Sequence, residues 1–163
     1  MPFAALRGPL LLDIAAVAPD FEMHNQFGET VRLSQFRGVK PVALVFFPLA
    51  FTGICTGELC ELRDNLAAFE QNGVELLTVS VDSKATLRVF AEQEGYQFSL
   101  LADFWPHGAV AQQYGVFLDE RGTAGRATFV IDESGIIRSR FATEPGAPRP
   151  LASYLDALQS LSS

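Results

Sequence analysis

Residues 42–60 read VALVFFPLAFTGICTGELC and contain both cysteines of the chain, Cys55 and Cys60. The run at 42–47 is continuously apolar, which is typical of a β-strand covered on both faces. After it, apolar residues recur at helical spacing as far as about Gln71. The stretch therefore predicts a strand, a turn and a helix, with Cys55 in the first turn of the helix.

Segments with strand and helix patterns alternate along the rest of the chain. We expect a short strand or turn at 31–36, a strand at 74–81, a helix at 84–94, a short strand near 98–101, a helix at about 108–114, a hairpin of 126–132 with 135–141, and an amphipathic helix at about 151–161. This order predicts an α/β fold with a mixed central sheet flanked by helices, compatible with a thioredoxin-like fold. No linker or repeat interrupts the sequence, so we expect one domain over residues 1–163, with a short N-terminal extension at about 1–12.

Composition excludes several classes of function. The chain has 12 basic and 19 acidic residues and no basic run, which argues against nucleic acid or an anionic membrane as its main partner. The apolar residues 9–18 are interrupted by Asp13 and fall short of the ~20 residues of a membrane span. Two cysteines in a chain of this size do not form a secreted disulfide scaffold. We therefore expect an N-terminal strand or arm and a cytoplasmic protein.

Cys55 lies where a helix is expected to begin. The backbone N–H groups and the dipole at a helix N-terminus stabilise negative charge, and a thiolate is far more nucleophilic than a thiol. Thr52 can offer a hydroxyl to the sulfur or to an incoming oxygen, and Pro48 stiffens the approach to the turn. These residues indicate redox chemistry at Cys55. The alternative is a buried, unreactive cysteine that fills space in the core.

The spacing Pro48-x-x-x-Thr52-x-x-Cys55 resembles the peroxiredoxin signature around the peroxidatic cysteine. Other segments similar to that family follow the family's order over about residues 18–141: APDF at 18–21, LRD at 62–64, SVD at 80–82, Asp103, YGV at 114–116 and RATFVID at 126–132. Residues 46–55 and the segment DFWPHGAV at 103–110 are most similar to the alkyl hydroperoxide reductase E type. The position of Cys60 is instead similar to the bacterioferritin-comigratory, or Q-type, peroxiredoxins.

This resemblance implies a thioredoxin-like fold and a thiol-dependent peroxidase. The Cys55 thiolate would attack the terminal oxygen of a hydroperoxide, giving a sulfenic acid and water or an alcohol. The resemblance further implies that Arg126 stabilises the thiolate and polarises the peroxide, that Thr52 hydrogen-bonds the reacting oxygens, and that Pro48 shields the sulfenate. Glu58 matches a position that orients the arginine. The alternatives are a surface charge at a strand edge for Arg126 and an ordinary helix-surface carboxylate for Glu58.

Cys60 would resolve the sulfenic acid by analogy with the Q-type proteins, and helix geometry limits how. Residues i and i+5 of an α-helix lie ~8.6 Å apart at Cα, whereas a disulfide requires about 4.4–6.8 Å. Cys55 and Cys60 therefore cannot bond while the helix is intact, and its first turns must unwind. The alternative is a buried Cys60 thiol, with resolution by an external thiol.

The resemblance also implies partners: a hydroperoxide substrate, a thiol reductant (thioredoxin, a mycoredoxin-type protein or a low-molecular-weight thiol) and a second copy of the chain in a homodimer. Phe51, Phe104 and Trp105 either line an apolar pocket or dimer surface or pack in the core. Arg63 is either a second site arginine or a surface ion-pair partner, and we favour the ion pair.

Other functions stay open at this point. A peroxide-sensing redox switch that acts on a partner protein would use the same Cys55. A thiol-disulfide oxidoreductase would share the fold class but requires Cys-x-x-Cys, whereas four residues separate Cys55 and Cys60. A copper chaperone would need a closer cysteine pair and a well-placed histidine. We expect no cofactor and no metal site, because His24 and His107 lack the spacing of metal ligands.

Overall fold

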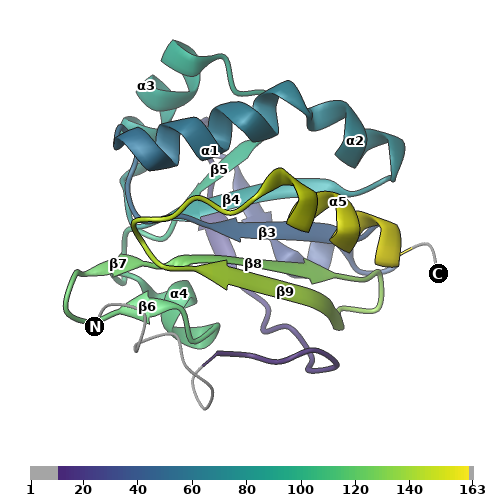
Figure 1. The fold of residues 1–163 in the computed structure, drawn as a ribbon. Helices are drawn as coiled ribbons and strands as arrows, with labels where there is room; N and C mark the ends of the chain where they lie inside the picture. The colour runs from purple at the N-terminus through teal and green to yellow at the C-terminus, as the bar shows by residue number, and fades with distance from the viewer. Residues whose placement is uncertain (1–10, 162–163) are drawn as a thin grey trace.

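The apolar run forms β3 (Val42–Phe46), a strand buried along its whole length within a seven-stranded sheet (Figure 1). The structure is a computed structural model that describes residues 11–161. The strands are β1 (Glu22–His24), β2 (Thr30–Arg32), β3, β4 (Glu75–Ser80), β5 (Ser99–Ala102), β8 (Arg126–Ile131) and β9 (Ile137–Thr143), in the order β2-β1-β5-β4-β3-β8-β9. Two further short strands, β6 (Phe117–Leu118) and β7 (Thr123–Ala124), pair with each other. The predicted α/β fold with a mixed central sheet is confirmed.

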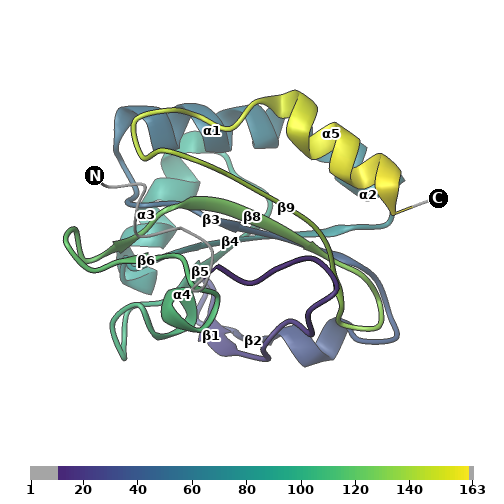
Figure 2. The ribbon, with the colours of Figure 1, turned by 60° about the horizontal axis from the view of Figure 1, so that its bottom comes forward.

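Helices cover both faces of the sheet (Figure 2). They are η2 (Leu33–Phe36), a 3-10 helix, and the α-helices α1 (Gly53–Asp64), α2 (Leu66–Gln71), α3 (Lys84–Glu94), α4 (Ala109–Gln113) and α5 (Leu151–Ser160). α1, α2 and α5 lie on one face, whereas α4 lies on the other (Figures 1 and 2). None of the helices in residues 11–161 is long and apolar enough to cross a membrane.

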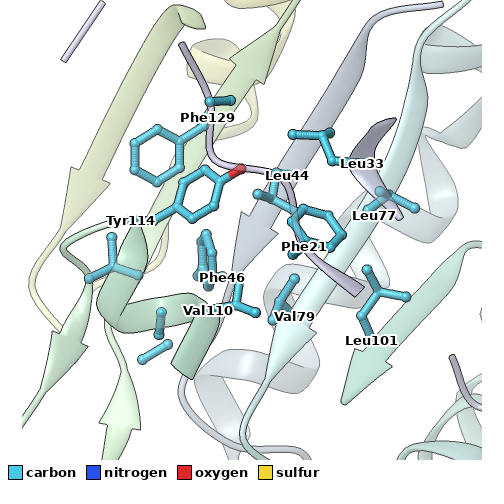
Figure 3. Packing of buried hydrophobic residues seen from close by; sticks show 14 of the residues in the cluster. Phe21, Leu33, Leu44, Phe46, Leu77, Val79, Leu101, Val110, Tyr114 and Phe129 are labelled. Atoms are coloured by element: carbon cyan, nitrogen blue, oxygen red, sulfur yellow. The ribbon is translucent and has the colours of Figure 1, made fainter. Parts of the chain in front are cut away.

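Side chains at residues 42–47 alternate between the two faces of the sheet, and an apolar core lies on each face. Ala43, Val45 and Phe47 point to one face, where they pack with residues of α1, α3 and α5. Val42, Leu44 and Phe46 point to the other face, where they join a cluster around Tyr114 (Figure 3). In that cluster the ring centroid of Tyr114 lies 5.5 Å from that of Phe46 and 5.2 Å from that of Phe129. A strand buried on both faces therefore needs the continuously apolar sequence that β3 has.

Strand directions bring several loops to one edge of the sheet. β3, β4 and β5 are mutually parallel, so the segments that follow them leave at the same edge. β8 is antiparallel to β3 and begins at that edge, and β9 is antiparallel to β8 and ends there. The turn before α1, the start of β8 and the segment between β9 and α5 consequently meet, although they are distant in sequence.

The boundaries differ from the predicted ones at a few positions. The helix expected from Gly53 to Gln71 is interrupted at Asn65, whose φ of −119° and ψ of 19° are not helical. The 31–36 segment is part strand and part 3-10 helix, and the predicted hairpin is β8 with β9. Residues 12–18 run along the β8–β9 turn, where Val17 bridges Ile136. The predicted N-terminal extension, about 1–12, lies almost entirely outside the described residues.

Candidate active site

Cys55 lies in the first turn of α1, as predicted, and its thiol is free. Cys55 is 0% exposed and lies in the apolar core between α1 and β3. The residues before it, Thr52, Gly53 and Ile54, are exposed. The sulfur therefore lies just beneath the surface, against a helix N-terminus.

The turn that leads into α1 is held in a strained conformation. Phe51 has a φ of +67°, a left-handed conformation that costs a bulky residue on the order of 1–3 kcal/mol. Two contacts hold the turn. Ala50 N–H donates to Asp82 Oδ2 at 2.8 Å, and the Phe51 ring packs on Phe90 with 4.9 Å between centroids. Ser80 Oγ in turn donates to the same Asp82 oxygen at 2.6 Å, so the end of β4 positions the turn.

Thr52 is the residue that precedes α1, but its side chain does not cap the helix. Its Oγ1 donates instead to Leu49 O at 2.9 Å, within the turn. The first N–H groups of an α-helix have no acceptor within the helix, so they are available to an anion at this position. Pro48 is half-buried at the start of the same turn. Pro48 and Thr52 thus belong to the turn that leads into the first turn of α1, which contains Cys55.

A buried ion-pair network lies one turn further along α1. Glu58 Oε1 accepts hydrogen bonds from Arg126 Nη1 at 2.6 Å and from Arg149 Nη2 at 3.0 Å. Glu58 Oε2 accepts from the backbone N–H of Arg149 at 2.6 Å and from Arg149 Nε at 3.1 Å. The side chains of all three residues are at most 4% exposed. Surface roles for Glu58 and Arg126 are therefore wrong.

The network carries a net positive charge beside the thiol. Burial alone would raise the pKa of Glu58, but the charge and hydrogen bonds of Arg149, with the charge of Arg126, lower it below its ordinary value. Burial alone would lower the pKa of Arg149, but its interactions with Tyr154, Glu58 and Cys55 raise it. Two guanidinium groups thus oppose one carboxylate. The remaining positive charge favours negative charge that develops on an oxygen bound next to Cys55.

Sequence reasoning missed Arg149. It lies in the segment between β9 and α5, in the sequence EPGAPRP at 144–150, and belongs to none of the motifs recognised in the sequence. Its side chain is 0% exposed and also donates from Nη1 to Thr128 Oγ1 at 3.1 Å. The available signal was an arginine between two prolines, at the sheet edge where the hairpin's second strand ends. Arg126 reaches the same segment, because its Nε donates to Pro145 O at 2.7 Å.

Cys60 contacts residues at and just beyond the C-terminal end of α3. It is half-buried, and its Sγ donates to Glu94 Oε1 at 3.4 Å and lies 3.6 Å from Tyr96 Oη. Cys55 and Cys60 both belong to the uninterrupted helix α1, so the spacing derived for an intact helix applies to them. Both cysteines are therefore present as free thiols, and the intact helix keeps their sulfur atoms apart.

The structure also places an arginine and three aromatic residues whose roles the sequence left open. Arg63 forms the expected surface ion pair, with Nε 2.9 Å from Asp64 Oδ1. Phe104 and Trp105 are 53% and 84% exposed, so the alternative that they pack in the core is wrong. Phe51 is 48% exposed, and its ring packs on the buried Phe90. Among residues 11–161, no group of three or more His, Cys, Asp and Glu side chains could hold a metal ion.

Comparisons with known proteins agree with this geometry. Residues 14–140 match the AhpC/TSA family. Alkyl hydroperoxide reductase E of Mycobacterium tuberculosis is 50% identical over 151 residues, which cover 93% of this chain and 99% of that protein. Chloroplastic peroxiredoxin Q of Triticum aestivum is 33% identical over 147 residues, covering 90% of this chain and 66% of the relative.

Solved structures give the same result for the fold. The crystal structure of peroxidoxin BcpB from Mycobacterium tuberculosis superposes with a TM-score of 0.80 at 30% identity, covering 93% of this chain and 97% of that one. Reduced 2-Cys peroxiredoxin of Plasmodium vivax superposes with a TM-score of 0.81 at 30% identity, covering 90% and 80%. The fold is thus thioredoxin-like, as expected from the resemblance. A cysteine at a helix start beside a buried arginine network, in a chain matched over nearly its full length, places this protein in the AhpC/TSA family as a peroxiredoxin, an enzyme that acts as a thiol peroxidase.

Proposed function

We propose that Cys55 reduces hydrogen peroxide or organic hydroperoxides and that Cys60 resolves the resulting sulfenic acid. The observation that carries the proposal is the burial of Cys55 at the start of α1, beside the network in which Glu58 holds Arg126 and Arg149. The protein's membership of a thiol peroxidase family supports the chemistry, and the structure supports the choice of the sulfur.

In the first step, the Cys55 thiolate attacks the terminal oxygen of the hydroperoxide. An S–O bond forms while the O–O bond breaks, which gives a sulfenic acid and a hydroxide or alkoxide. The leaving oxygen takes from solvent the equivalent of the proton that the Cys55 thiol released on ionising, and it departs as water or an alcohol. Negative charge moves from sulfur to oxygen during this step, so fixed positive groups near both atoms lower the barrier.

The residues around Cys55 have distinct roles in this proposal. The N–H groups of the first turn of α1 and the two guanidinium groups stabilise the charge on sulfur and on the leaving oxygen. The Thr52 hydroxyl, now bonded to Leu49 O, turns to hydrogen-bond the peroxide. Pro48 shields the sulfenate from water. Glu58 fixes the orientation of both arginines through its two oxygens.

Resolution by Cys60 requires unwinding within α1, and the first turn is suited to it. Gly53 and Gly57 flank Cys55 within the helix, where glycine is about 0.5–1 kcal/mol less favourable than alanine. Neither is required by packing, because a Cβ added at either position would meet no atom within 4 Å. The first turn also contains no acidic residue and no side-chain cap. Its weakness supports a step in which Cys55 moves toward Cys60.

The proposal includes a thiol reductant and a homodimeric state. The 55–60 disulfide would be reduced by thioredoxin, a mycoredoxin-type protein or a low-molecular-weight thiol in the cytoplasm. A homodimer is supported by exposed apolar side chains near the active-site edge of the sheet: Phe51 precedes α1, and Phe104 and Trp105 follow β5. Large aromatic side chains are enriched at protein interfaces.

The test is peroxide consumption with a recycling thiol, compared among wild type, C55S and C60S. We expect C55S to lose all turnover. We expect C60S to perform one fast reduction per chain and then to depend on external thiol for each further cycle. Turnover by C55S would overturn the assignment of Cys55. An identical turnover of C60S and wild type with every reductant, without a disulfide in the oxidised wild type, would overturn the assignment of Cys60.

A further inference from the structure

We infer that Glu94 is a catalytic residue of the resolving step, the base that takes the proton from Cys60 as Cys60 attacks the Cys55 sulfenic acid. The inference rests on the proposed function of Cys60. The inference is based on a direct contact between the sulfur and a carboxylate: Cys60 Sγ donates a hydrogen bond to Glu94 Oε1 at 3.4 Å.

The two thiols of α1 have different charged and polar neighbours. Cys55 interacts electrostatically with the Arg149 guanidinium group. Cys60 faces a carboxylate, Glu94, and the phenol of Tyr96. A thiolate is a far better nucleophile than a thiol, so Cys60 must lose its proton to attack the sulfenic acid. The Glu94 carboxylate supplies a proton acceptor at the distance of a hydrogen bond from that sulfur.

Of the groups that face Cys60, Glu94 is the one suited to be the base. These groups are Glu94 at the end of α3, Tyr96 just beyond it, and Arg63 on α1, whose charge also interacts with Cys60. Burial, followed by the hydrogen bond with Cys60 and the charges of Cys60 and Glu94, raises the pKa of Tyr96, so its phenol stays protonated. Arg63 is a cation and bonds the backbone oxygen of Glu94 at 2.6 Å and the carboxylate of Asp64 at 2.9 Å. Within residues 11–161 the Glu94 carboxylate forms no ion pair, which leaves it able to accept a proton.

The contact between Glu94 and Cys60 must persist while the helix opens, and the anchoring of α1 allows this. The helix is fixed from Glu58 onward: Glu58 is held by the two arginines, and Leu59 and Leu62 are fully or almost fully buried. The first half contains Gly53 and Gly57, and Ile54 beside them is 36% exposed. Unwinding therefore moves Cys55, whereas Cys60 stays against Glu94.

The step balances without any added oxidant. Glu94 takes the Cys60 proton, and the sulfur lone pair of Cys60 attacks the Cys55 sulfur. The S–S bond forms as the S–O bond of the sulfenic acid breaks, and the departing hydroxide takes the proton from Glu94 and leaves as water. The Cys60 sulfur is oxidised and the Cys55 sulfur is reduced.

The experiment compares wild type, E94Q, E94D and the control E92Q. Glu92 is on the same helix, but its carboxylate is exposed and pairs with Arg88 at 3.6 Å. Reduced protein is mixed with one equivalent of hydrogen peroxide and quenched at intervals, and free thiol, sulfenic acid and 55–60 disulfide are measured by mass spectrometry from pH 5.5 to 8.5. General-base assistance contributes typically about 10²–10⁴-fold, so we expect disulfide formation in E94Q to slow by at least about tenfold at pH 7.

The other readouts separate catalysis from structure. E94Q should form sulfenic acid at the wild-type rate, and its disulfide rate should rise more steeply with pH than that of wild type. E94D should keep part of the rate, and E92Q all of it. Disulfide formation in E94Q at the wild-type rate and with the wild-type pH profile would overturn the role of Glu94. Oxidation of Cys55 without any disulfide in wild type would overturn resolution by Cys60 and this inference with it, and absence of Cys55 oxidation would overturn the proposed function itself.

Discussion

Arg149 lies 91 residues from Glu58 in sequence, yet it donates three hydrogen bonds to that one carboxylate, from its backbone N–H, Nε and Nη2. The contact ties the segment before α5 to the helix that holds Cys55. It also adds a second guanidinium group to the one supplied by Arg126 at the start of β8. The buried ion-pair network next to Cys55 is thus assembled from three distant parts of the chain: α1, the start of β8 and the segment before α5.

Replacing Glu58 by glutamine should destabilise the protein. The change leaves two buried guanidinium groups with no opposing charge, and breaking a buried pair in this way costs about 3–5 kcal/mol. Because the folded-state pKa of Glu58 is lowered, its contribution is present above the unfolded-state pKa of about 4.3 and is lost as the pH falls through the folded-state pKa. Urea unfolding of wild type and E58Q from pH 7 to pH 3 checks this. The difference in unfolding free energy should shrink at acidic pH, and a difference that stays constant over that range would contradict it.

Replacing Arg126 or Arg149 by alanine should slow the reaction of Cys55 with peroxide. Each change removes one of the two positive charges that we assign to the transition state, and loss of a single such group costs about 10²–10³-fold in rate. Arg88 on α3, which is exposed and pairs with Glu92, offers a control that should react like wild type. The rates are compared under conditions where circular dichroism shows each variant to be folded. A folded R126A protein with wild-type reactivity would refute the electrostatic role.

Thr52→Val keeps the shape of the side chain but removes its hydroxyl. Since Thr52 Oγ1 bonds a turn carbonyl rather than a helix N–H, we expect little loss of stability. The hydroxyl is assigned to the reacting oxygens, so the peroxide rate should fall by about one to two orders of magnitude, the range of a lost charge-stabilising hydrogen bond. Thr52→Ser restores the hydroxyl and should recover most of the rate. Equal rates for the valine and serine variants would remove Thr52 from the reaction.

Gly57→Ala tests whether α1 must unwind. The added methyl group meets no atom within 4 Å, so the change should stabilise the helix by about 0.5–1 kcal/mol. Disulfide formation should slow by about two- to fivefold, while sulfenic acid formation keeps its rate. Time-resolved mass mapping of the two cysteines measures both steps. Faster disulfide formation in G57A would mean that the helix does not open before resolution.

Much of this architecture could be predicted from local sequence. The continuous apolar run of β3 and the helical spacing after Cys55 set the strand–turn–helix unit, and both appear as expected. The break at Asn65 could not be seen, because Leu62, Leu66 and Phe69 continue the apolar spacing across it. At the break the Asn65 side chain donates from Nδ2 to Glu61 O at 2.8 Å, a local contact that the apolar spacing does not record.

The site was predictable to the extent that its residues belong to local motifs. Thr52 and Cys55 lie within four residues of each other, and Arg126 stands in a recognisable strand. Arg149 and Glu94 have no such signal, because each acts through a tertiary contact: one with Glu58 and the other with Cys60. Contacts of this kind depend on strand order and helix docking, which single-residue patterns do not encode.

The central claim is that Cys55 is the peroxidatic thiol, and its rate of oxidation tests it most directly. Reduced wild type, C60S and C55S are mixed with hydrogen peroxide in a stopped-flow instrument, and the fluorescence of the single tryptophan, Trp105, is followed. We expect wild type and C60S to react at the same rate, orders of magnitude faster than free cysteine. We expect no reaction of C55S. A wild-type rate equal to that of free cysteine would contradict it.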